Sequence, residues 1–384
     1  MTTTKNNEHK KLNVPNLRFK EFEGEWEMCK FKDVCSTSTG NKNTQDKIDD
    51  GIYPFYVRSQ TVERINSWTF DGEAILTAGD GVGVGKVFHH TYGKIGVHQR
   101  VYILSNFKCD ANYLFHFFSS NFYNRVKRMS AKNSVDSVRK EMITEMPLYL
   151  PSEQEQTKIG VLLSLLDERI ATQNKIIDKL QSLIKGINQR VFMNNGINYK
   201  LGEISEIRSG YSGNQLMSKK GLKVSRIETI SGHKVNLERV GYVAPFEFSE
   251  NYKLQVGDIL FSNINSVEYI GNTAFIDKDY DLYHGMNLLR LTPNNMVVIP
   301  FYLYLLLNTN RMLNRFKTVC NKAVSQASIN QTELGKTVVQ IPDINAQKQI
   351  CELYQALYDK LESEKYANSL FQKQKQYLLR QMFI

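Results

Sequence analysis

The sequence reads LYLPSEQEQTKI over residues 148–159 and VQIPDINAQKQI over residues 339–350. Both stretches pass from a short apolar run through a proline into a glutamine-containing segment, and Pro151 and Pro342 lie 191 residues apart. A long internal repeat indicates two copies of one structural unit. The repeated stretch therefore marks the same junction twice, where a globular part gives way to a long helical segment.

Further matches lie upstream of this junction. The offset between the copies changes along the chain because their loops differ in length. The matched pairs are Tyr113 with Tyr302, His98 with His284, and Gly40 with Gly210. Two copies of one fold with different loops suit two related but unequal binding tasks.

Each copy ends in a segment whose apolar residues recur at alternating steps of three and four, the period of a coiled coil. About forty residues of helix reach about 60 Å, so a second helix must cover the apolar stripe, and the other copy can supply it. Polar positions interrupt the stripe at Gln173 in the first copy and at Glu364, Asn368 and Lys375 in the second. The positions predicted to form the coiled coil and bind partners are Ile159, Leu162, Leu166, Ile177, Leu180, Ile350, Leu353, Leu357, Phe371 and Leu378.

The rest of each copy is mixed. Short apolar runs predict strands at residues 74–77, 101–104, 258–261 and 288–291, and one helix is expected per copy, over residues 113–128 and 301–317. We predict an α+β chain with two similar mixed α/β domains, each followed by a long helix, in a duplicated, pseudo-twofold arrangement. The expected segments are a domain over 1–151, a helix over 152–195, a domain over 196–341 and a helix over 342–384.

The charge is basic in both copies. Lys and Arg number 49 against 39 Asp and Glu, a net charge of +10. Residues 1–195 hold 27 basic and 22 acidic side chains and residues 196–384 hold 22 and 17, so each half carries +5. Two similar basic bodies suggest a polyanion held at two places, and a merely basic soluble protein is the alternative.

Composition excludes several other classes. The apolar fraction of 41% and the aromatic fraction of 11% are those of a globular protein, not of a disordered or collagen-like chain. No run of 18 apolar residues occurs, and the first residues lack the apolar core of a secretory signal. The five cysteines form no Cys-x-x-Cys pair, which disfavours structural zinc and a disulfide framework. We expect a cytoplasmic chain with reduced thiols and no membrane contact.

No catalytic motif is complete. The glycine-rich loop Gly79–Lys86 lacks the Gly-Lys-Ser/Thr of a P-loop because Val87 follows Lys86. No Pro-Pro occurs, so the adenine-methyltransferase motif is missing, and Pro342-Asp343 has no Asp/Glu-x-Lys after it as a restriction nuclease would require. The seven histidines lack metal-ligand spacing. The sequence therefore predicts no catalytic residues, no metal site and no cofactor in this chain.

The arrangement and several local motifs resemble the specificity subunit of type I restriction–modification enzymes. Residues 17–26 look like the usual opening of that family, and residues 53–58 and 222–227 look like its first-strand motif in each half. Residues 150–156 resemble its Pro-x-x-Glu-Gln junction. The second copy departs there, with Ala346-Gln347. The resemblance covers essentially the whole chain.

The resemblance implies that each globular part is a target recognition domain for one half of a split sequence in double-stranded DNA. It implies that the two helices pack antiparallel, set the spacing of the domains and dock two modification subunits. Those subunits hold S-adenosylmethionine and methylate adenine, and motor–nuclease restriction subunits then join. This chain would supply specificity without chemistry of its own.

Family homologues tend to place loops near the first-strand motif against DNA, where Arg, Lys, Asn and Gln reach base edges. The candidate DNA-binding residues are Lys42, Asn43, Arg58, Ser59, Gln60, Lys86, His98, Gln99, Tyr211, Asn214, Arg226 and His233. A solvated or structural loop residue is the competing interpretation for each. The competing function is a coiled-coil scaffold with two protein-binding domains and no DNA contact. A fused methyltransferase–specificity chain would be far longer and carry catalytic motifs.

Overall fold

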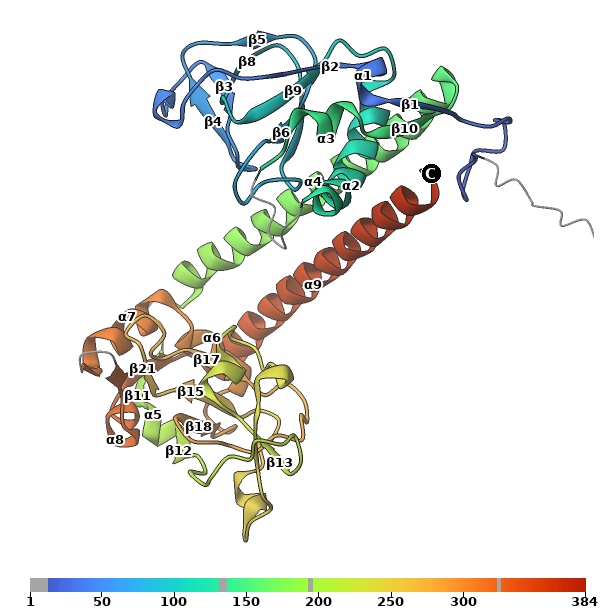
Figure 1. Cartoon of the computed structure of the whole chain (residues 1–384). Helices are drawn as coiled ribbons and strands as arrows, with labels where there is room; N and C mark the ends of the chain where they lie inside the picture. Colours follow the sequence, from blue (N-terminus) through green and yellow to red (C-terminus); the bar gives the residue numbers. More distant parts are fainter. Residues whose placement is uncertain (1–12, 131–136, 193–195, 323–325) are drawn as a thin grey trace, which may run out of the picture. The chain divides into compact units, whose positions relative to one another are not determined.

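The computed structural model describes residues 13–130, 137–192, 196–322 and 326–384 (Figure 1). It divides into two units, residues 1–175 with 365–384 and residues 176–364. Two long helices, α4 (Glu153–Val191) and α9 (Ile344–Gln381), cross the division. Each unit thus holds one mixed domain, the start of the helix that follows it, and the end of the helix that follows the other copy.

The first and last strands of the first domain pair with each other. Strand β1 (Glu27–Lys30) pairs antiparallel with β10 (Pro147–Leu150), and the strands between them form two four-stranded sheets, ordered β2-β9-β6-β7 and β4-β3-β8-β5. Strands β3 and β8 pair in parallel. The strand bounds are β2 (Ser36–Thr39), β3 (Tyr53–Tyr56), β4 (Val62–Ile65), β5 (Phe70–Asp71), β6 (Ala74–Ala78), β7 (Phe88–Thr91), β8 (Lys94–Val97) and β9 (Val101–Ser105).

Helix α2 (Ala111–Met129) contributes one face to the first core, where Phe118 and Phe122 share a buried cluster with Phe31 and Ile75. The Asp110 carboxylate accepts a hydrogen bond from the Tyr113 N–H and caps this helix. Two short helices and one 3-10 turn complete the domain: α1 (Phe31–Val34), α3 (Lys140–Thr144) and η1 (Thr44–Asp46).

Arg125, near the basic C-terminal end of α2, stabilises the packing of this helix against α3. The Arg125 guanidinium donates hydrogen bonds to the carbonyls of Met142 (2.7 Å) and Glu145 (2.8 Å), at α3 and just after it. Arg125 therefore joins two elements of the domain.

The second domain repeats this plan. Strand β11 (Ile197–Lys200) pairs antiparallel with β21 (Val338–Ile341), and a four-stranded sheet follows the order β12-β18-β15-β17. A β13-β14 pair and a small β16-β20-β19 sheet complete the strands. Their bounds are β12 (Ser205–Ser209), β13 (Leu222–Val224), β14 (Gly241–Val243), β15 (Ile259–Ser262), β16 (Ile264–Asn265), β17 (Thr273–Phe275), β18 (Leu288–Pro293), β19 (Asn321–Lys322) and β20 (Ala327–Ser328).

One helix prediction is wrong in the second domain. The sequence predicts a single helix over 301–317, whereas the structure has α6 (Pro300–Leu307) and α7 (Asn310–Val319). The break arises because the Thr309 hydroxyl accepts a hydrogen bond from the Met312 N–H and starts a new helix. The remaining helical elements are α5 (Leu201–Ile204), α8 (Gln331–Gly335), η2 (Ile227–Ile230), η3 (Leu237–Arg239) and η4 (Ser249–Tyr252).

The repeated glutamine performs the same task in both copies. The Gln156 amide accepts from the Asp110 N–H (3.0 Å) and donates to the Pro151 carbonyl (2.8 Å). The Gln347 amide accepts from the Ile299 N–H and donates to the Pro342 carbonyl, both at 2.8 Å. Each glutamine thus ties the first turn of a long helix to the segment before a domain helix.

The departure of the second copy at this junction also has a physical reason. Glu155 is fully buried, and both its oxygens accept hydrogen bonds from the Arg18 guanidinium at 2.8 Å. A buried carboxylate needs such a partner. Ala346 stands at the matching position of the second copy, so that copy has no carboxylate to pair there.

The repeated glycines allow a close approach of two backbones. A Cβ atom on Gly40 would lie 2.1 Å from the Val97 carbonyl oxygen, and one on Gly210 would lie 1.9 Å from that of Gly285. Parallel bridges form beside both glycines, Lys42 with His98 and Tyr211 with Gly285. The prediction of two similar mixed α/β domains, each followed by a long helix, is confirmed.

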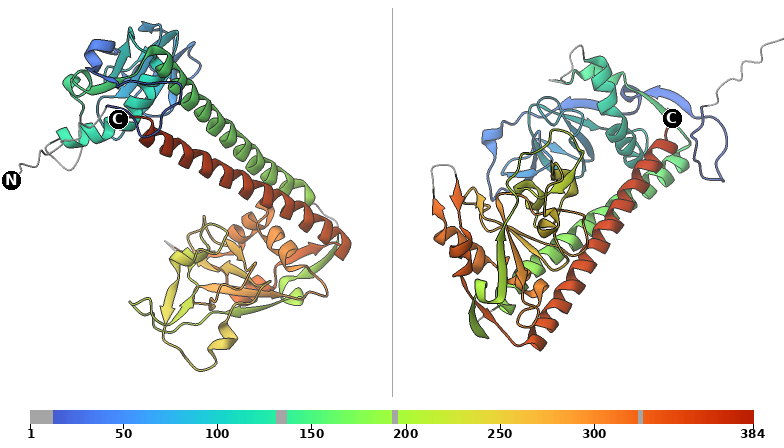
Figure 2. Two further views of the ribbon diagram at one scale, coloured as in Figure 1. Left: turned by 90° about the vertical axis from the view of Figure 1, so that its right-hand side faces the viewer. Right: turned by 90° about the horizontal axis from the view of Figure 1, so that it is seen from below.

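In the first unit, the start of α4 and the end of α9 pack antiparallel (Figure 2). The Asp167 carboxylate accepts from Lys375, and the Asn368 amide donates to Asn174 at 2.8 Å, so positions rise along one helix while they fall along the other. Two polar positions of the α9 stripe, Asn368 and Lys375, thus meet polar partners across the seam. Leu162, Leu166, Phe371 and Leu378 line the same seam.

In the second unit, the end of α4 packs against the start of α9 through Ile177, Leu180, Ile350 and Leu357. The stripe differs from the prediction at one position. Leu353 is 42% exposed, while the neighbouring Tyr354 is fully buried and donates its hydroxyl hydrogen to Asn188. In the described residues, no helix is both long and apolar enough to cross a membrane.

Candidate nucleic-acid interface

Two predicted loops of the first domain are joined by hydrogen bonds. Lys42 and His98 form a parallel bridge, and the Gln99 N–H donates to the Lys42 carbonyl at 2.8 Å. The Gln99 side-chain amide also donates to the Asn43 side-chain oxygen at 2.6 Å. Asn43 and Gln99 are exposed, so the structure presents two side-chain amides next to each other.

An ion-pair group lies among these loops. The Asp80 carboxylate is 2.9 Å from the Arg58 guanidinium and 3.7 Å from that of Arg100. The side chains of Arg58 and Arg100 are 45% and 66% exposed, so both remain accessible to a ligand. The sequence analysis missed Arg100, although it directly follows Gln99.

Ser59, Gln60 and Lys86 are exposed on neighbouring loops of the first domain. The Gln60 amide donates to the Phe88 carbonyl at 3.5 Å, and the Lys86 ammonium lies 5.5 Å from the centre of the Tyr123 ring. The glycine-rich loop that carries Lys86 joins β6 to β7, which pair antiparallel, so it is a hairpin connection.

His98 is the exception in this group because its ring is only 4% exposed. Its Nδ1 accepts from the Arg100 N–H at 3.0 Å, and its Nε2 lies 3.3 Å from the Thr44 hydroxyl. Burial, assisted by the nearby Arg58 cation, lowers the pKa of His98 below its usual value. The buried ring therefore connects the loop at Thr44 with the loop at Arg100.

In the second domain, Tyr211 lies in a pocket of about 580 Å³. Its ring stacks on Phe246 with 3.7 Å between centroids and 7° between planes. Arg208 and Arg290 also line the pocket. Arg290 is 7% exposed and donates to the Lys253 and Asn251 carbonyls at 3.2 Å each, which fixes its position.

The other candidates of the second domain divide into two groups. Asn214 and Arg226 are exposed, and Arg226 follows Ser225, whose hydroxyl accepts from the N–H of Gly285, the bridge partner of Tyr211. His233 belongs elsewhere, because its carbonyl accepts from the Tyr304 hydroxyl at 3.0 Å and it lines a different pocket. The sequence analysis missed Arg208, Phe246 and Arg290, which reach Tyr211 only through folding.

These side chains can bind a polyanion and discriminate its bases. Guanidinium groups pair with phosphates or guanine edges, side-chain amides pair with adenine, and exposed rings stack on bases. Among the residues that the structure describes, no group of three or more His, Cys, Asp or Glu side chains could hold a metal ion.

Comparison with known proteins agrees with this architecture. The inferred type I restriction enzyme MjaX specificity subunit of Methanocaldococcus jannaschii is 43% identical over 150 residues, 38% of this chain and 35% of that protein. This alignment therefore spans about a third of that relative. The MjaVIII specificity subunit of the same organism is 24% identical, with 94% of each chain covered.

A solved structure shares the fold. It is the S subunit of a type I restriction–modification system from M. genitalium, with a TM-score of 0.67, 16% identity, and coverage of 97% of this chain and 99% of that one. The model of the family described as type I restriction modification DNA specificity domain matches residues 23–182 and 196–369. The chain therefore belongs to the type I restriction–modification DNA specificity family.

Proposed function

We propose that this chain is the DNA sequence-specificity subunit of a type I restriction–modification complex, and that each domain reads one half of a split target in double-stranded DNA. The observation that carries the proposal is the duplication. Each domain presents its own group of arginine and polar or aromatic side chains, around Arg58 in the first and around Tyr211 in the second. Since the groups differ in chemistry, they suit two different half-sites.

Two tethered readers can each be weak. Once one domain is bound, the other acts at a high effective concentration, so their contributions combine without new contacts. The net charge of +10 supports a large phosphate contribution to the affinity. The competing scaffold function without DNA contact gives the exposed Arg58 and Arg100 no role beyond their ion pairs with Asp80.

The long helices offer a surface for two modification subunits. In the first unit, Leu165 lines the open seam between α4 and α9 and is 58% exposed, and Leu370 and Tyr377 on α9 are 45% and 59% exposed. Exposed apolar side chains on a pair of helices are the kind of surface that further helices bury. The same helices would set the spacing of the two half-sites.

We assign the chemistry to the partners. Modification subunits would hold S-adenosylmethionine and methylate adenine, and motor–nuclease restriction subunits would cleave. The chain alone should neither methylate nor cut DNA, because the sequence lacks the motifs for both reactions. Methylation should appear when modification subunits are added.

The decisive experiment maps methyladenine in host DNA with this gene present and deleted. A split methylated motif that disappears on deletion supports the proposal. If the modification subunits are expressed and deletion leaves every methylated motif unchanged, the proposal is wrong. Turnover by the pure chain with S-adenosylmethionine would refute the non-catalytic assignment.

A further inference from the structure

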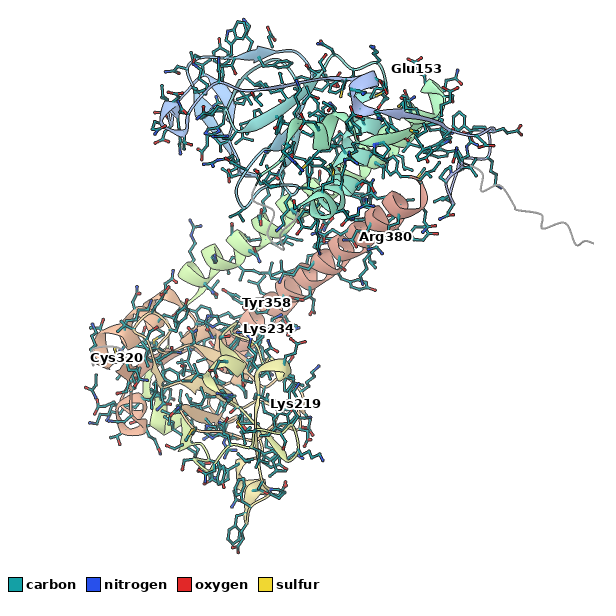
Figure 3. All side chains as sticks on the ribbon, viewed as in Figure 1. Glu153, Lys219, Lys234, Cys320, Tyr358 and Arg380 are labelled. Atoms are coloured by element: carbon teal, nitrogen blue, oxygen red, sulfur yellow. The ribbon has the colours of Figure 1, made fainter. Side chains whose placement is uncertain are left out.

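A second pocket of the second unit has a different chemistry from the one around Tyr211, and the two share no lining residue. It measures about 490 Å³. Its wall combines the loop at residues 232–235, the end of β17, helix α6 and one face of α9; Lys234 and Tyr358, from the loop and from α9, are labelled in Figure 3. Of the candidate DNA-binding residues, only His233 lines this pocket.

Aromatic rings make up much of the pocket wall. The rings of Phe301 and Tyr304 are stacked, with 6.0 Å between centroids and 19° between planes. Phe275 lies 5.4 Å from Phe301, and Tyr358 on α9 meets Phe301 edge-on at 6.4 Å. All four side chains are partly exposed, so they leave aromatic surface to a ligand. Ring faces carry a negative potential that attracts cations.

The charged side chains of the pocket are mostly acidic, so the pocket, like the ring faces, has a negative potential. Asp277, Asp359 and Glu362 line it together with one lysine, Lys234, whose ammonium lies 3.0 Å from Glu362. The Asp359 carboxylate accepts from the Gln355 amide at 2.9 Å, and the Asp277 carboxylate accepts from the Tyr280 hydroxyl at 2.5 Å. Neutral donors thus orient two carboxylates without cancelling their charge. DNA would be repelled here, although the chain as a whole is basic.

We propose that this pocket binds an arginine side chain of a modification subunit that docks along α9. The identity of the partner rests on the proposed function. A planar guanidinium can stack on the rings while its N–H groups donate to the carboxylates, which a lysine ammonium cannot do. Because Tyr358, Asp359 and Glu362 belong to α9, the pocket is continuous with the helix that the partner is proposed to cover.

The first test removes the charge and keeps the shape. The variant Asp277→Asn/Asp359→Asn retains an oxygen that can accept from Tyr280 and Gln355. The matched control, Glu238→Gln/Glu268→Gln, removes two exposed carboxylates of the same unit outside both the pocket and α9. The dissociation constant of purified modification subunit for the full chain should rise about tenfold in the pocket variant and less than about twofold in the control. Equal values for the pocket variant and the control would overturn the inference.

The second test changes the Tyr358 ring and adds free argininamide as a competitor. Tyr358→Leu should weaken the assembly, and Tyr358→Phe should restore it. Argininamide should inhibit assembly of the wild-type chain, whereas its neutral isostere citrullinamide, at matched ionic strength, should not. The charge variant should lose this sensitivity. Equal inhibition by both amides would count against the pocket even if Tyr358→Leu fails to fold.

Failure of the arginine site can be distinguished from failure of the proposed function. If the wild-type chain binds DNA and modification subunits but the pocket variants assemble normally, only the arginine site is wrong. If the wild-type chain binds no modification subunit, the proposed function fails and this inference fails with it.

Discussion

Phe383 packs edge-on against Tyr113, with 5.2 Å between ring centroids and 63° between ring planes. Tyr113 lies in the first turn of α2 in the first domain, while Phe383 follows the end of α9. The second unit repeats the contact, since Phe192 after α4 lies 5.4 Å from Tyr302, the repeat counterpart of Tyr113. The core of each domain is therefore completed by the end of the helix that follows the other copy.

This contact predicts a stability effect at the very end of the chain. Phe383→Ala should destabilise the first unit by about 3 kcal/mol, because it deletes a buried ring and leaves a cavity. Amide hydrogen exchange over residues 111–129 in the full chain measures the loss. The neighbouring Ile384, which is 41% exposed, provides the control, and Ile384→Ala should leave the exchange unchanged. Equal effects of the two substitutions would show that the end of the chain does not belong to the core.

We expect that replacing Asp80 by a neutral residue increases the affinity for DNA. Its carboxylate lies between Arg58 and Arg100 and offsets part of their charge. Asp80→Asn should therefore tighten DNA binding by the chain with modification subunits, and Arg58→Ala should weaken it. If Arg58 contacts a phosphate, Arg58→Ala should also lower the slope of log K against log salt by about 1. Fluorescence anisotropy over a salt series measures both, and tighter binding by Arg58→Ala would contradict the interface.

Substitutions around Arg58 and around Tyr211 should each impair recognition of a different half-site. Tyr211→Leu removes a ring from the pocket of the second domain, where a stacking contact with a base contributes about 1–3 kcal/mol. Methylation assays on targets with one half-site mutated at a time should show relaxed selectivity at only one half-site. Arg58→Ala should affect only the other half-site. Relaxation of the same half-site by both variants would mean that the domains do not read separately.

The large features of the fold could be predicted from sequence because they repeat. The period of apolar residues identified α4 and α9, and the matched prolines fixed the junction before each helix. The stripe failed locally at Leu353, because hydrophobicity ranks leucine above tyrosine while the packed helix buries Tyr354. A tyrosine can take a core position when its hydroxyl finds a partner, here Asn188.

The candidate interface was only partly predictable, for a different reason. Lys42, Asn43 and Gln99 could be proposed because the family that the chain resembles tends to place such loops against DNA, and the fold joins them by hydrogen bonds. Tyr211 and Arg290, however, are far apart in sequence and line one pocket only through the pairing of β12 with β18. No local pattern signals such a meeting. Likewise, only the structure reveals that His98 is buried.

The long helices predict a dependence of target spacing on helix length. Inserting one heptad into each helix, near Gln173 and Glu364, keeps the seam in register. It adds about 10 Å, or about three base pairs, which also turn the second half-site by about a third of a turn. The affinity of the double insertion for the original target should fall at least about tenfold. Any methylation that remains should occur on targets with a longer spacer between the half-sites. A heptad in one helix only should destabilise the subunit, because the two helices then no longer match in length. Unchanged affinity of the double insertion for the original spacing would show that the helices do not set it.

We expect the stability of the first unit to depend on pH because of the buried His116. The ring is 1% exposed, and its Nδ1 lies 3.8 Å from Asp167, which also pairs with Lys375. Burial lowers the pKa of His116 to about 4, helped by the Lys375 ammonium and the His90 ring and opposed by Asp167 and Asp110. The folded state therefore resists protonation at a pH where the unfolded chain, with a histidine pKa of about 6.5, already binds a proton. Stability should fall as the pH drops from about 6.5 to about 4, by up to about 3 kcal/mol from this residue.

The second copy provides the matched substitution, because the position 189 residues later is Leu305, which is 1% exposed. His116→Leu should fill the same space without a titratable group. Protection of the amides of residues 111–129 against hydrogen exchange, compared at pH 4.5 and pH 7.5 after correction for intrinsic rates, should then change less with pH than in the wild-type chain. The buried His284, whose pKa is also lowered to about 4, should keep the pH response of the second unit intact. If His116→Leu leaves the pH response of the first unit as large as before, other groups in that unit cause it.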